Sequence, residues 1–243
     1  MTETGSAGRR VVVTGGASGI GAATVEQLLE AGAAVTVVDR EVEDGSLPAD
    51  VEVVRADVTV AAEIGEAIER AAASMGGIDA LVASAGMALR GNIEETTPED
   101  WDRVFAVNAR GVYLAGRAAL PHLREGREPA IVNVASQLGL VANASNAAYC
   151  ASKGAVIQLT RAMAIDAIGD GVRVNAVCPG ATRTPMTTRH YADAEDVRGQ
   201  EAQLIGRLIE PGEIAAAIVF LASPAASAMV GEIVVVDGGY TIH

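Results

Sequence analysis

Short runs of valine, isoleucine and alanine alternate along the chain with longer alanine-rich segments. This alternation limits the possible folds more than any other feature of the sequence. Seven such runs occur, at Val11–Val13, Val35–Val38, Val51–Val54, Ala80–Ala83, Ile131–Val134, Val172–Val177 and Ile233–Val236. Short, largely apolar runs rich in β-branched residues are typical of strands that are buried on both faces of a parallel sheet.

The segments between these runs have the apolar spacing of helices. They include Ala22–Ala31, Ala61–Met75, Pro98–Leu120, Ala147–Ile168 and Pro211–Ala222. Strands that alternate with helices predict the α/β class, here a doubly wound Rossmann domain with a seven-stranded parallel sheet and helices on both faces. The sequence shows no repeat and no linker-like stretch, so we expect a flexible N-terminus (residues 1–8) and a single domain over residues 9–243.

One polar stretch, residues 186–205, interrupts this pattern. It is rich in Thr, Arg, Asp, Glu and Gln and follows a predicted strand. Loops at the carboxyl ends of parallel strands commonly carry binding residues. We therefore expect residues 186–205 to form short helices that cover the substrate as a lid.

Charge and composition exclude several classes of function. The chain has 18 basic and 31 acidic residues and a formal charge of −13, which disfavours nucleic acid and anionic membrane surfaces as partners. No apolar run reaches the ~18 residues of a membrane span, and the polar N-terminus does not resemble a signal peptide. Two cysteines and three scattered histidines show no metal-ligand spacing. We expect a metal-free, cytoplasmic protein.

A glycine-rich loop follows the first predicted strand and precedes the first helix. Gly15, Gly19 and Gly21 allow a tight turn that brings backbone N–H groups close to a pyrophosphate, which then lies at a helix N-terminus. Ser18 and Ile20 lie within the same loop. The G-x-x-x-G-x-G spacing, in this position, predicts binding of a dinucleotide.

The ends of the second and third strands carry residues suited to adenosine. Asp39 can accept hydrogen bonds from both hydroxyls of the adenosine ribose, which favours NAD over NADP. Arg40 follows directly and can bind a 2′-phosphate, so NADP stays possible. Asp57 can hydrogen-bond the adenine amino group, and its neighbour Val58 belongs to the same predicted contact.

A tyrosine and a lysine lie four residues apart at the start of a predicted helix. Tyr149 and Lys153 therefore share one helix face. A tyrosine with its ordinary pKa of about 10 is a poor base at neutral pH, and a nearby ammonium group lowers that pKa. Lys153 is the only lysine among 18 basic residues, which indicates a specific need for an ammonium group. Ser136, after the fifth strand, can hold a substrate oxygen beside Tyr149.

These motifs together make the chain resemble the short-chain dehydrogenase/reductase family, of the classical type, from about Arg9 to Tyr240. The motifs are Thr14-Gly15-x-x-x-Gly19-x-Gly21, Asn108 in Val107-Asn108, Ser136, Tyr149-x-x-x-Lys153, Pro179-Gly180 with Thr184, and the ending Val236-Asp237-Gly238-Gly239.

The resemblance implies a role for each of these residues. Tyr149 is the general acid/base, Lys153 lowers its pKa and binds the nicotinamide ribose, and Ser136 orients the reacting oxygen. Asn108 holds a water in a proton relay, and Thr184 contacts the cofactor near its carboxamide. The other implied cofactor contacts are Ala85, Gly86, Pro179, Gly180 and Thr182. Members of the family are usually homotetramers.

Two departures from the family pattern concern the cofactor. Where the family usually has Asn-Asn-Ala-Gly, this chain has Ala83-Ser84-Ala85-Gly86, which puts the bracing of the cofactor loop in doubt. The residue two before Thr184 is normally aliphatic and is Thr182 here, so the nicotinamide contact is expected to be more polar.

The sequence therefore predicts an NAD-dependent oxidoreductase that interconverts a secondary alcohol and a ketone. An NADP-dependent ketone or 3-oxoacyl reductase is the alternative within this class. A catalytically silent cofactor-sensing protein is the alternative from another class. We expect a small-molecule substrate in contact with Met87, Leu138, Asn143 and Met186, and a homotetramer that assembles through Pro98–Leu120 and the helix beginning near Ala147.

Overall fold

A seven-stranded parallel sheet forms the centre of the computed structural model, which describes residues 6–42, 47–49, 51–190 and 203–242. The strands are β1 (Arg10–Thr14), β2 (Ala34–Asp39), β3 (Glu52–Arg55), β4 (Ala80–Ala83), β5 (Ala130–Val134), β6 (Arg173–Pro179) and β7 (Ile233–Val236). They lie in the order β3-β2-β1-β4-β5-β6-β7, and every neighbouring pair is parallel. The predicted fold class is confirmed.

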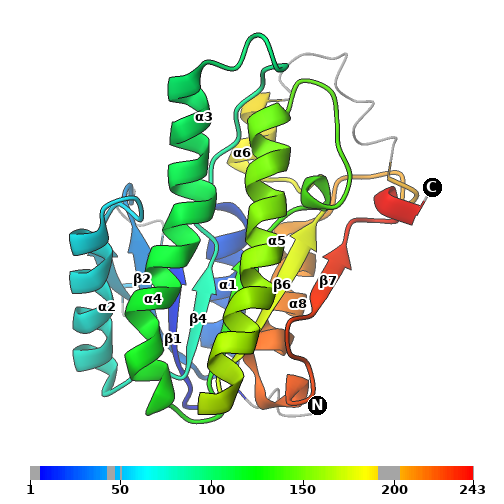
Figure 1. Cartoon of the computed structure of the whole chain (residues 1–243). Helices are drawn as coiled ribbons and strands as arrows, with labels where there is room; N and C mark the ends of the chain where they lie inside the picture. The colour runs from blue at the N-terminus through cyan, green and yellow to red at the C-terminus, as the bar shows by residue number, and fades with distance from the viewer. Residues whose placement is uncertain (1–5, 43–46, 50, 191–202, 243) are drawn as a thin grey trace.

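Helices cover both faces of this sheet (Figure 1). The helices are α1 (Gly19–Glu30), α2 (Ala61–Met75), α3 (Pro98–Phe105), α4 (Gly111–Arg124), α5 (Ala147–Ala167), α6 (Pro185–His190) and α8 (Pro211–Ala222). In Figure 1, α2, α4 and α5 lie in front of the sheet, and α1 and α8 lie behind it, where they pack against each other. Two apolar layers result, one on each face, and the central strands contribute fully buried side chains to both.

The order of the strands fixes where a ligand can bind. The chain proceeds from β1 outward through β2 to β3, and then returns to the other side of β1 with β4. The loops that follow β1 and β4 therefore diverge and leave a crevice at the carboxyl ends of these two strands. This is the position where doubly wound sheets bind their ligands.

The predicted helix Pro98–Leu120 is not one regular helix. It consists of α3, a π-helical turn at Ala106–Arg110 (η1) and α4, which extends to Arg124. Asn108 lies in the π turn and is bonded to the loop after β4, a contact that helical periodicity does not reveal. Helical periodicity predicted this segment correctly as helical but did not reveal the π turn within it.

Other element bounds differ by a few residues. The helix expected from Ala22 already begins at Gly19, within the glycine loop, and the sixth strand continues to Pro179. Ser6 is buried, and the Gly8 N–H donates to the Gly32 carbonyl at 2.8 Å. The packed chain thus begins within the segment that we expected to be flexible, while residues 1–5 lie outside the described part.

The predicted lid is described at its two ends. Residues 185–190 form α6, and the Ile205 N–H donates to the Gly238 carbonyl at 3.2 Å. Residues 191–202 lie outside the described part, so a lid there stays a prediction. Among the described residues, no helix is both long enough and apolar enough to cross a membrane.

Candidate active site

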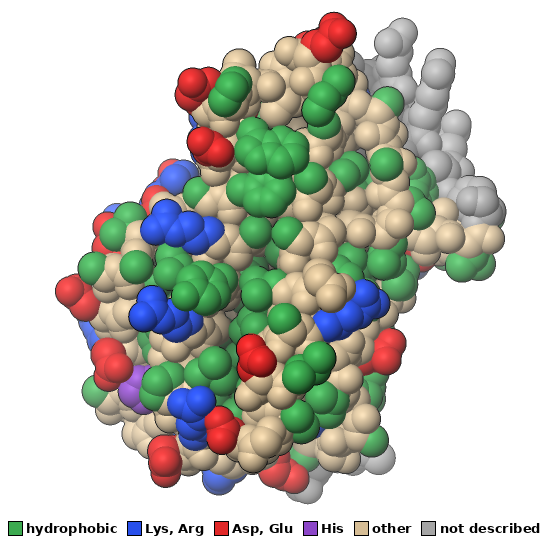
Figure 2. Space-filling model, in the orientation of Figure 1, with side chains coloured by type: hydrophobic (Ala, Val, Ile, Leu, Met, Phe, Trp, Pro, Cys, Tyr) green, Lys and Arg blue, Asp and Glu red, His purple; other side chains and the backbone are tan. Residues whose placement is uncertain are grey.

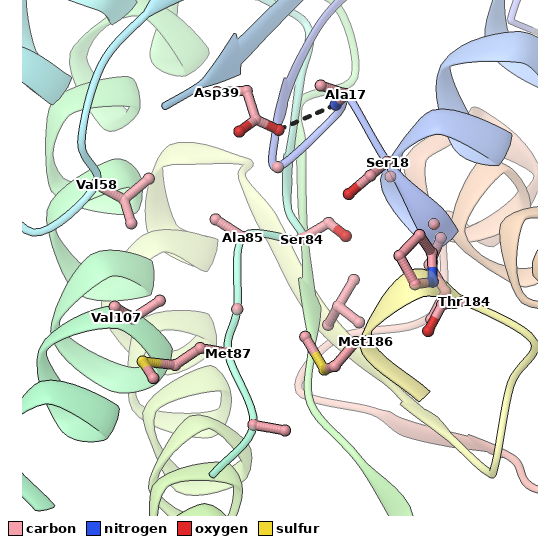
Figure 3. A pocket seen from close by; sticks show the side chains of 18 of the residues that line it. Ala17, Ser18, Asp39, Val58, Ser84, Ala85, Met87, Val107, Thr184 and Met186 are labelled. Atoms are coloured by element: carbon pink, nitrogen blue, oxygen red, sulfur yellow. Dashed lines mark hydrogen bonds between the residues drawn. The ribbon is translucent and has the colours of Figure 1, made fainter. Parts of the chain in front are cut away.

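A cleft of about 1270 Å³ opens at the carboxyl ends of the strands. It is lined by Gly15, Ser18, Gly19, Ile20, Gly21, Asp39, Arg40, Asp57, Val58, Ala85, Gly86, Met87, Ser136, Tyr149, Lys153, Pro179, Gly180, Thr182, Thr184 and Met186, among others. Figure 3 shows Asp39 and Val58 on one side of this cleft and Thr184 and Met186 on the other. Residues from across the sequence therefore meet at one site.

The glycine loop packs too tightly for side chains. Gly15 has a φ of +68°, and a Cβ atom there would lie 2.6 Å from the Cα of Ala85. A Cβ atom on Gly21 would overlap the carbonyl oxygen of Gly15. Because Gly15 has no side chain, the glycine loop can pack against Ala85 in the segment after β4. Because Gly21 has none, the first turn of α1 can pack against the same loop.

The start of α1 has the features of an anion site. Ser18 is its N-cap, yet the Ser18 side chain makes no capping hydrogen bond, and the first turn contains no acidic residue. The N-terminal N–H groups and the helix dipole favour a negative charge at this end. Gly19 has a φ of +53°, and a Cβ atom there would lie 3.2 Å from the Thr184 side chain. The loop thus fits a pyrophosphate between α1 and α6.

Thr14 braces the loop after β4, where the sequence departs from the family pattern. The Ser84 N–H donates to the Thr14 carbonyl at 3.1 Å, and the Ala85 N–H lies 3.4 Å from the Thr14 hydroxyl. Both contacts come from the end of β1. The sequence signal for this bracing is Thr14, the first residue of the glycine motif, for which no bracing role was predicted.

Asp39 has a fixed orientation at the end of β2. Its Oδ2 accepts a hydrogen bond from the Ala17 N–H at 3.0 Å, drawn in Figure 3, and its Oδ1 accepts one from the Glu41 N–H at 3.2 Å. Each carboxylate oxygen has a second lone pair for another donor. The carboxylate is therefore positioned to receive the hydroxyls of a ribose.

The adjoining wall of the cleft is apolar. Val58, Ala85 and Val107 lie on one side of it in Figure 3, where a flat aromatic ring can pack. The carboxylate of Asp57 accepts hydrogen bonds from the Thr59 N–H at 2.8 Å and the Thr59 hydroxyl at 2.7 Å. These bonds lower the pKa of Asp57 and keep its carboxylate charged. The predicted contact of Asp57 with adenine stays a prediction.

Tyr149, Lys153 and Ser136 meet at the other end of the cleft. Lys153 Nζ donates to the Val134 carbonyl at 2.9 Å and lies 5.9 Å from the centre of the Tyr149 ring. Ser136 Oγ accepts a hydrogen bond from the Leu138 N–H at 3.1 Å, which leaves the hydroxyl proton available to a ligand. Burial lowers the pKa of Lys153 to about 8, because an apolar surrounding disfavours the ammonium form.

Asn108 acts on this site from behind the cleft wall. It is fully buried and does not line the cleft. Its Oδ1 accepts from the Met87 N–H at 2.8 Å, and its Nδ2 donates to the Met87 carbonyl and to the Ser152 hydroxyl. Both amide protons are thus used, one by the Met87 segment and the other by Ser152 on α5. The relay water that the resemblance implies would have to bind other atoms of Asn108.

The four predicted substrate contacts, all within the described residues, separate into two pairs. Met87 and Met186 line the cleft, whereas Leu138 and Asn143 do not. Leu138 lies in the 3₁₀ turn after Ser136, and Asn143 is exposed on the following loop. The cleft is also lined by Arg103, Val107 and Thr187, which sequence reasoning missed. Spacing alone offered a signal for Val107, which lies beside Asn108, and for Thr187, which lies one helical turn after Thr184.

Comparison with known proteins places the chain among reductases and dehydrogenases. Residues 15–241 match the sequence family described as enoyl-(acyl carrier protein) reductase. The cis-4-hydroxycyclohexanecarboxylate dehydrogenase of Sinomonas cyclohexanicum is 44% identical over 96% of both chains. The meso-2,3-butanediol dehydrogenase of Serratia marcescens is 40% identical over 95% of this chain and 94% of its own.

The fold is likewise that of a solved dehydrogenase. The ligand-free aldohexose dehydrogenase of Thermoplasma acidophilum superposes with a TM-score of 0.90 at 32% identity, over 98% of this chain and 96% of its own. The likeness therefore extends over almost the whole chain.

Proposed function

Because the chain belongs to the short-chain dehydrogenase/reductase family, we propose that it is an NAD-dependent oxidoreductase that interconverts a secondary alcohol and a ketone. One observation carries the proposal. Tyr149, Lys153 and Ser136 line one end of a cleft whose other end contains the oriented carboxylate of Asp39. A dinucleotide bound between these ends has its ribose hydroxyls at Asp39 and its reactive ring at Tyr149. We treat residues 9–243 as one catalytic unit built on a single sheet.

The residues of the cleft have different roles in the proposed reaction. The nicotinamide, when bound, accepts or releases the hydride. The ammonium group of Lys153 stabilises the tyrosinate form of Tyr149, which takes the proton of the substrate hydroxyl during oxidation and thereby becomes neutral tyrosine. Ser136 donates its hydroxyl proton to the substrate oxygen, while its own oxygen accepts from the Leu138 N–H. At pH 7 most of Lys153 carries its charge, since its pKa is about 8.

The substrate that we propose is a small cyclic secondary alcohol. Met87 and Met186 line the cleft, and methionine side chains adapt to irregular apolar shapes. A relative at 44% identity is named for a hydroxylated cyclohexane ring. The description of the matching family names enoyl reduction, but the hydroxyl groups of Ser136 and Tyr149, which both line the cleft, suit an oxygen that exchanges a proton.

NAD is the cofactor that the carboxylate of Asp39 favours. A 2′-phosphate there would face a fixed negative charge, whereas a 2′-hydroxyl would donate to it. Arg40 also lines this part of the cleft, so an NADP-dependent reductase is the second candidate.

We further propose a homotetramer located in the cytoplasm. Figure 2 shows apolar side chains gathered over α3 and the upper part of α5. Trp101 stacks on Phe105 with ring centres 4.7 Å apart, and Trp101 and Tyr113 are 36% and 46% exposed. A second copy packed against this face would bury them, as large exposed apolar patches commonly indicate. The free thiols of Cys150 and Cys178 suit a reducing compartment.

The test of the proposed activity is NADH formation from NAD and a panel of cyclic secondary alcohols. Tyr149→Phe is the matched variant, because it keeps the ring and removes the hydroxyl. We expect it to lower turnover by at least the ~10²-fold of general acid–base catalysis while NAD still binds. If the native protein binds NAD and turns over no alcohol or ketone, the silent cofactor-sensing protein is the correct interpretation.

A further inference from the structure

Five charged side chains surround the part of the cleft where the adenosine ribose of the proposed cofactor would lie. Two are positive, Arg40 and Arg55, and three are negative, Asp39, Glu41 and Asp57. Asp39 is held by two backbone N–H groups, as described above. The guanidinium of Arg55 donates to the Val42 carbonyl at 3.3 Å and so contacts the loop after β2. Arg40 is the remaining cation that can decide between NAD and NADP.

Both sides of the Arg40 guanidinium face carboxylates. Its Nη2 atom lies 3.0 Å from Glu41 Oε1, and its Nη1 atom lies 3.9 Å from Asp57 Oδ2. Asp57 is itself fixed by Thr59, so it provides a stationary negative charge. Arg40 thus spans from one carboxylate to the other across the ends of β2 and β3.

We infer that Glu41 is a positioning residue for cofactor specificity, because it pairs with Arg40 and thereby withholds this cation from a 2′-phosphate. The inference rests on the proposed function and deepens it. Asp39 repels a 2′-phosphate directly, whereas Glu41 acts through Arg40, the group that would otherwise offset that repulsion. The NAD preference then has two separable sources.

The effect of the Glu41 charge can be tested without disturbing Asp39 or Asp57. Its side chain is 83% exposed and contacts Arg40, while its backbone N–H holds Asp39. Glu41→Gln removes the charge and keeps that N–H, so the orientation of Asp39 is preserved. Asp57 is less suitable for a test, because its carboxylate also organises the turn at Thr59.

The expected effect is modest, because the ion pair is exposed to solvent. Such pairs contribute up to about 1 kcal/mol, which equals about fivefold in a dissociation constant. Glu41→Gln should therefore tighten binding of adenosine 2′,5′-bisphosphate by up to about fivefold. Binding of 5′-AMP, which has a free 2′-hydroxyl, should change by less than about twofold.

Isothermal titration calorimetry with these two nucleotides tests the inference without any turnover. Glu125→Gln is the matched control, because it removes the same charge from an exposed residue at the end of α4. Arg40→Gln/Glu41→Gln shows whether the gain needs the arginine. We expect Glu41→Gln to tighten bisphosphate binding relative to Glu125→Gln, and we expect the double variant to lose this gain.

Two outcomes would overturn the inference while leaving the proposed function intact. One is equal bisphosphate binding by Glu41→Gln and Glu125→Gln. The other is a gain that persists without Arg40, since removal of a repelling charge would then explain it. If the native protein binds neither 5′-AMP nor NAD, the proposed function itself fails, and the inference fails with it.

Discussion

Replacing Lys153 with methionine should stabilise the ligand-free protein while abolishing its activity. Lys153 is almost fully buried, and its hydrogen bond in the described structure goes to the Val134 carbonyl. Burial lowers its pKa from 10.5 to about 8, which means that folding disfavours the ammonium form. Methionine has a similar length and no charge, so it removes this unfavourable contribution.

The size of the effect follows from the pKa. Each pKa unit corresponds to 1.36 kcal/mol, so a change from 10.5 to about 8 destabilises the folded state by about 3 kcal/mol when the lysine is charged in both states. Methionine also leaves the Val134 carbonyl without this donor, at a cost of about 1 kcal/mol. At pH 7 the variant should therefore be more stable by about 2 kcal/mol.

The pH dependence has a definite sign. Below pH 8 Lys153 is charged in the folded and unfolded states, and the full destabilisation is present. Between about pH 8 and 10.5 the folded state has lost the proton and the unfolded state still binds it, so the stability of the lysine protein rises with pH. The advantage of the methionine variant should shrink across this window and reverse sign near pH 10.5, where only the lost hydrogen bond remains.

Urea denaturation at pH 7 and at pH 10.5 measures this difference. Both proteins should contain Tyr149→Phe, because a tyrosine titrates near pH 10 and would obscure the lysine. Protein concentration should be equal, since assembly contributes to apparent stability. A methionine variant that is less stable at pH 7, or a stability difference that does not change with pH, would refute the reasoning.

Four further expectations have direct measurements. Lys153→Arg should lose most turnover in the alcohol assay, because a planar guanidinium does not replace a compact ammonium group; full activity would contradict this. Gly21→Ala should abolish NAD binding in calorimetry, because its Cβ atom would overlap the Gly15 carbonyl; unchanged affinity would show that the loop can shift. Asp39→Ala should narrow the preference in kcat/KM for NAD, mainly by improving the value for NADP, and comparable native values would indicate that Arg40 governs the site. Sedimentation at micromolar concentration should show a tetramer, and a species of 24.7 kDa alone would exclude it.

The sheet and the glycine loop could be predicted because their signals are local. A strand buried on both faces must be apolar along its length, so Val11–Val13 and Val35–Val38 mark strands without knowledge of their neighbours. The Gly15 turn must follow the first strand directly, which places it at the centre of the sheet. Tyr149 and Lys153 share a helix face by spacing alone, and the structure places both in the cleft.

The remaining features depend on contacts between distant residues. The π turn at Asn108 coincides with the bonds between Asn108 and Met87, which lies 21 residues earlier. Leu138 was predicted to contact the substrate as part of the stretch 137–146, but it lies in a 3₁₀ turn and does not line the cleft. No periodicity in the sequence encodes either effect.

The hydrogen bonds of the buried cationic side chains indicate why the residue beside Tyr149 is the single lysine of the chain. Arg173 donates to three backbone carbonyls, and so does Arg9, so most of each buried guanidinium is occupied by the fold. Lys153 is equally buried, yet in the described part of the chain it donates to one carbonyl. An ammonium group has three protons, so two remain for a tyrosine oxygen and a ribose hydroxyl. The same incomplete pairing that should make the Lys153→Met protein more stable leaves the native ammonium group available for catalysis.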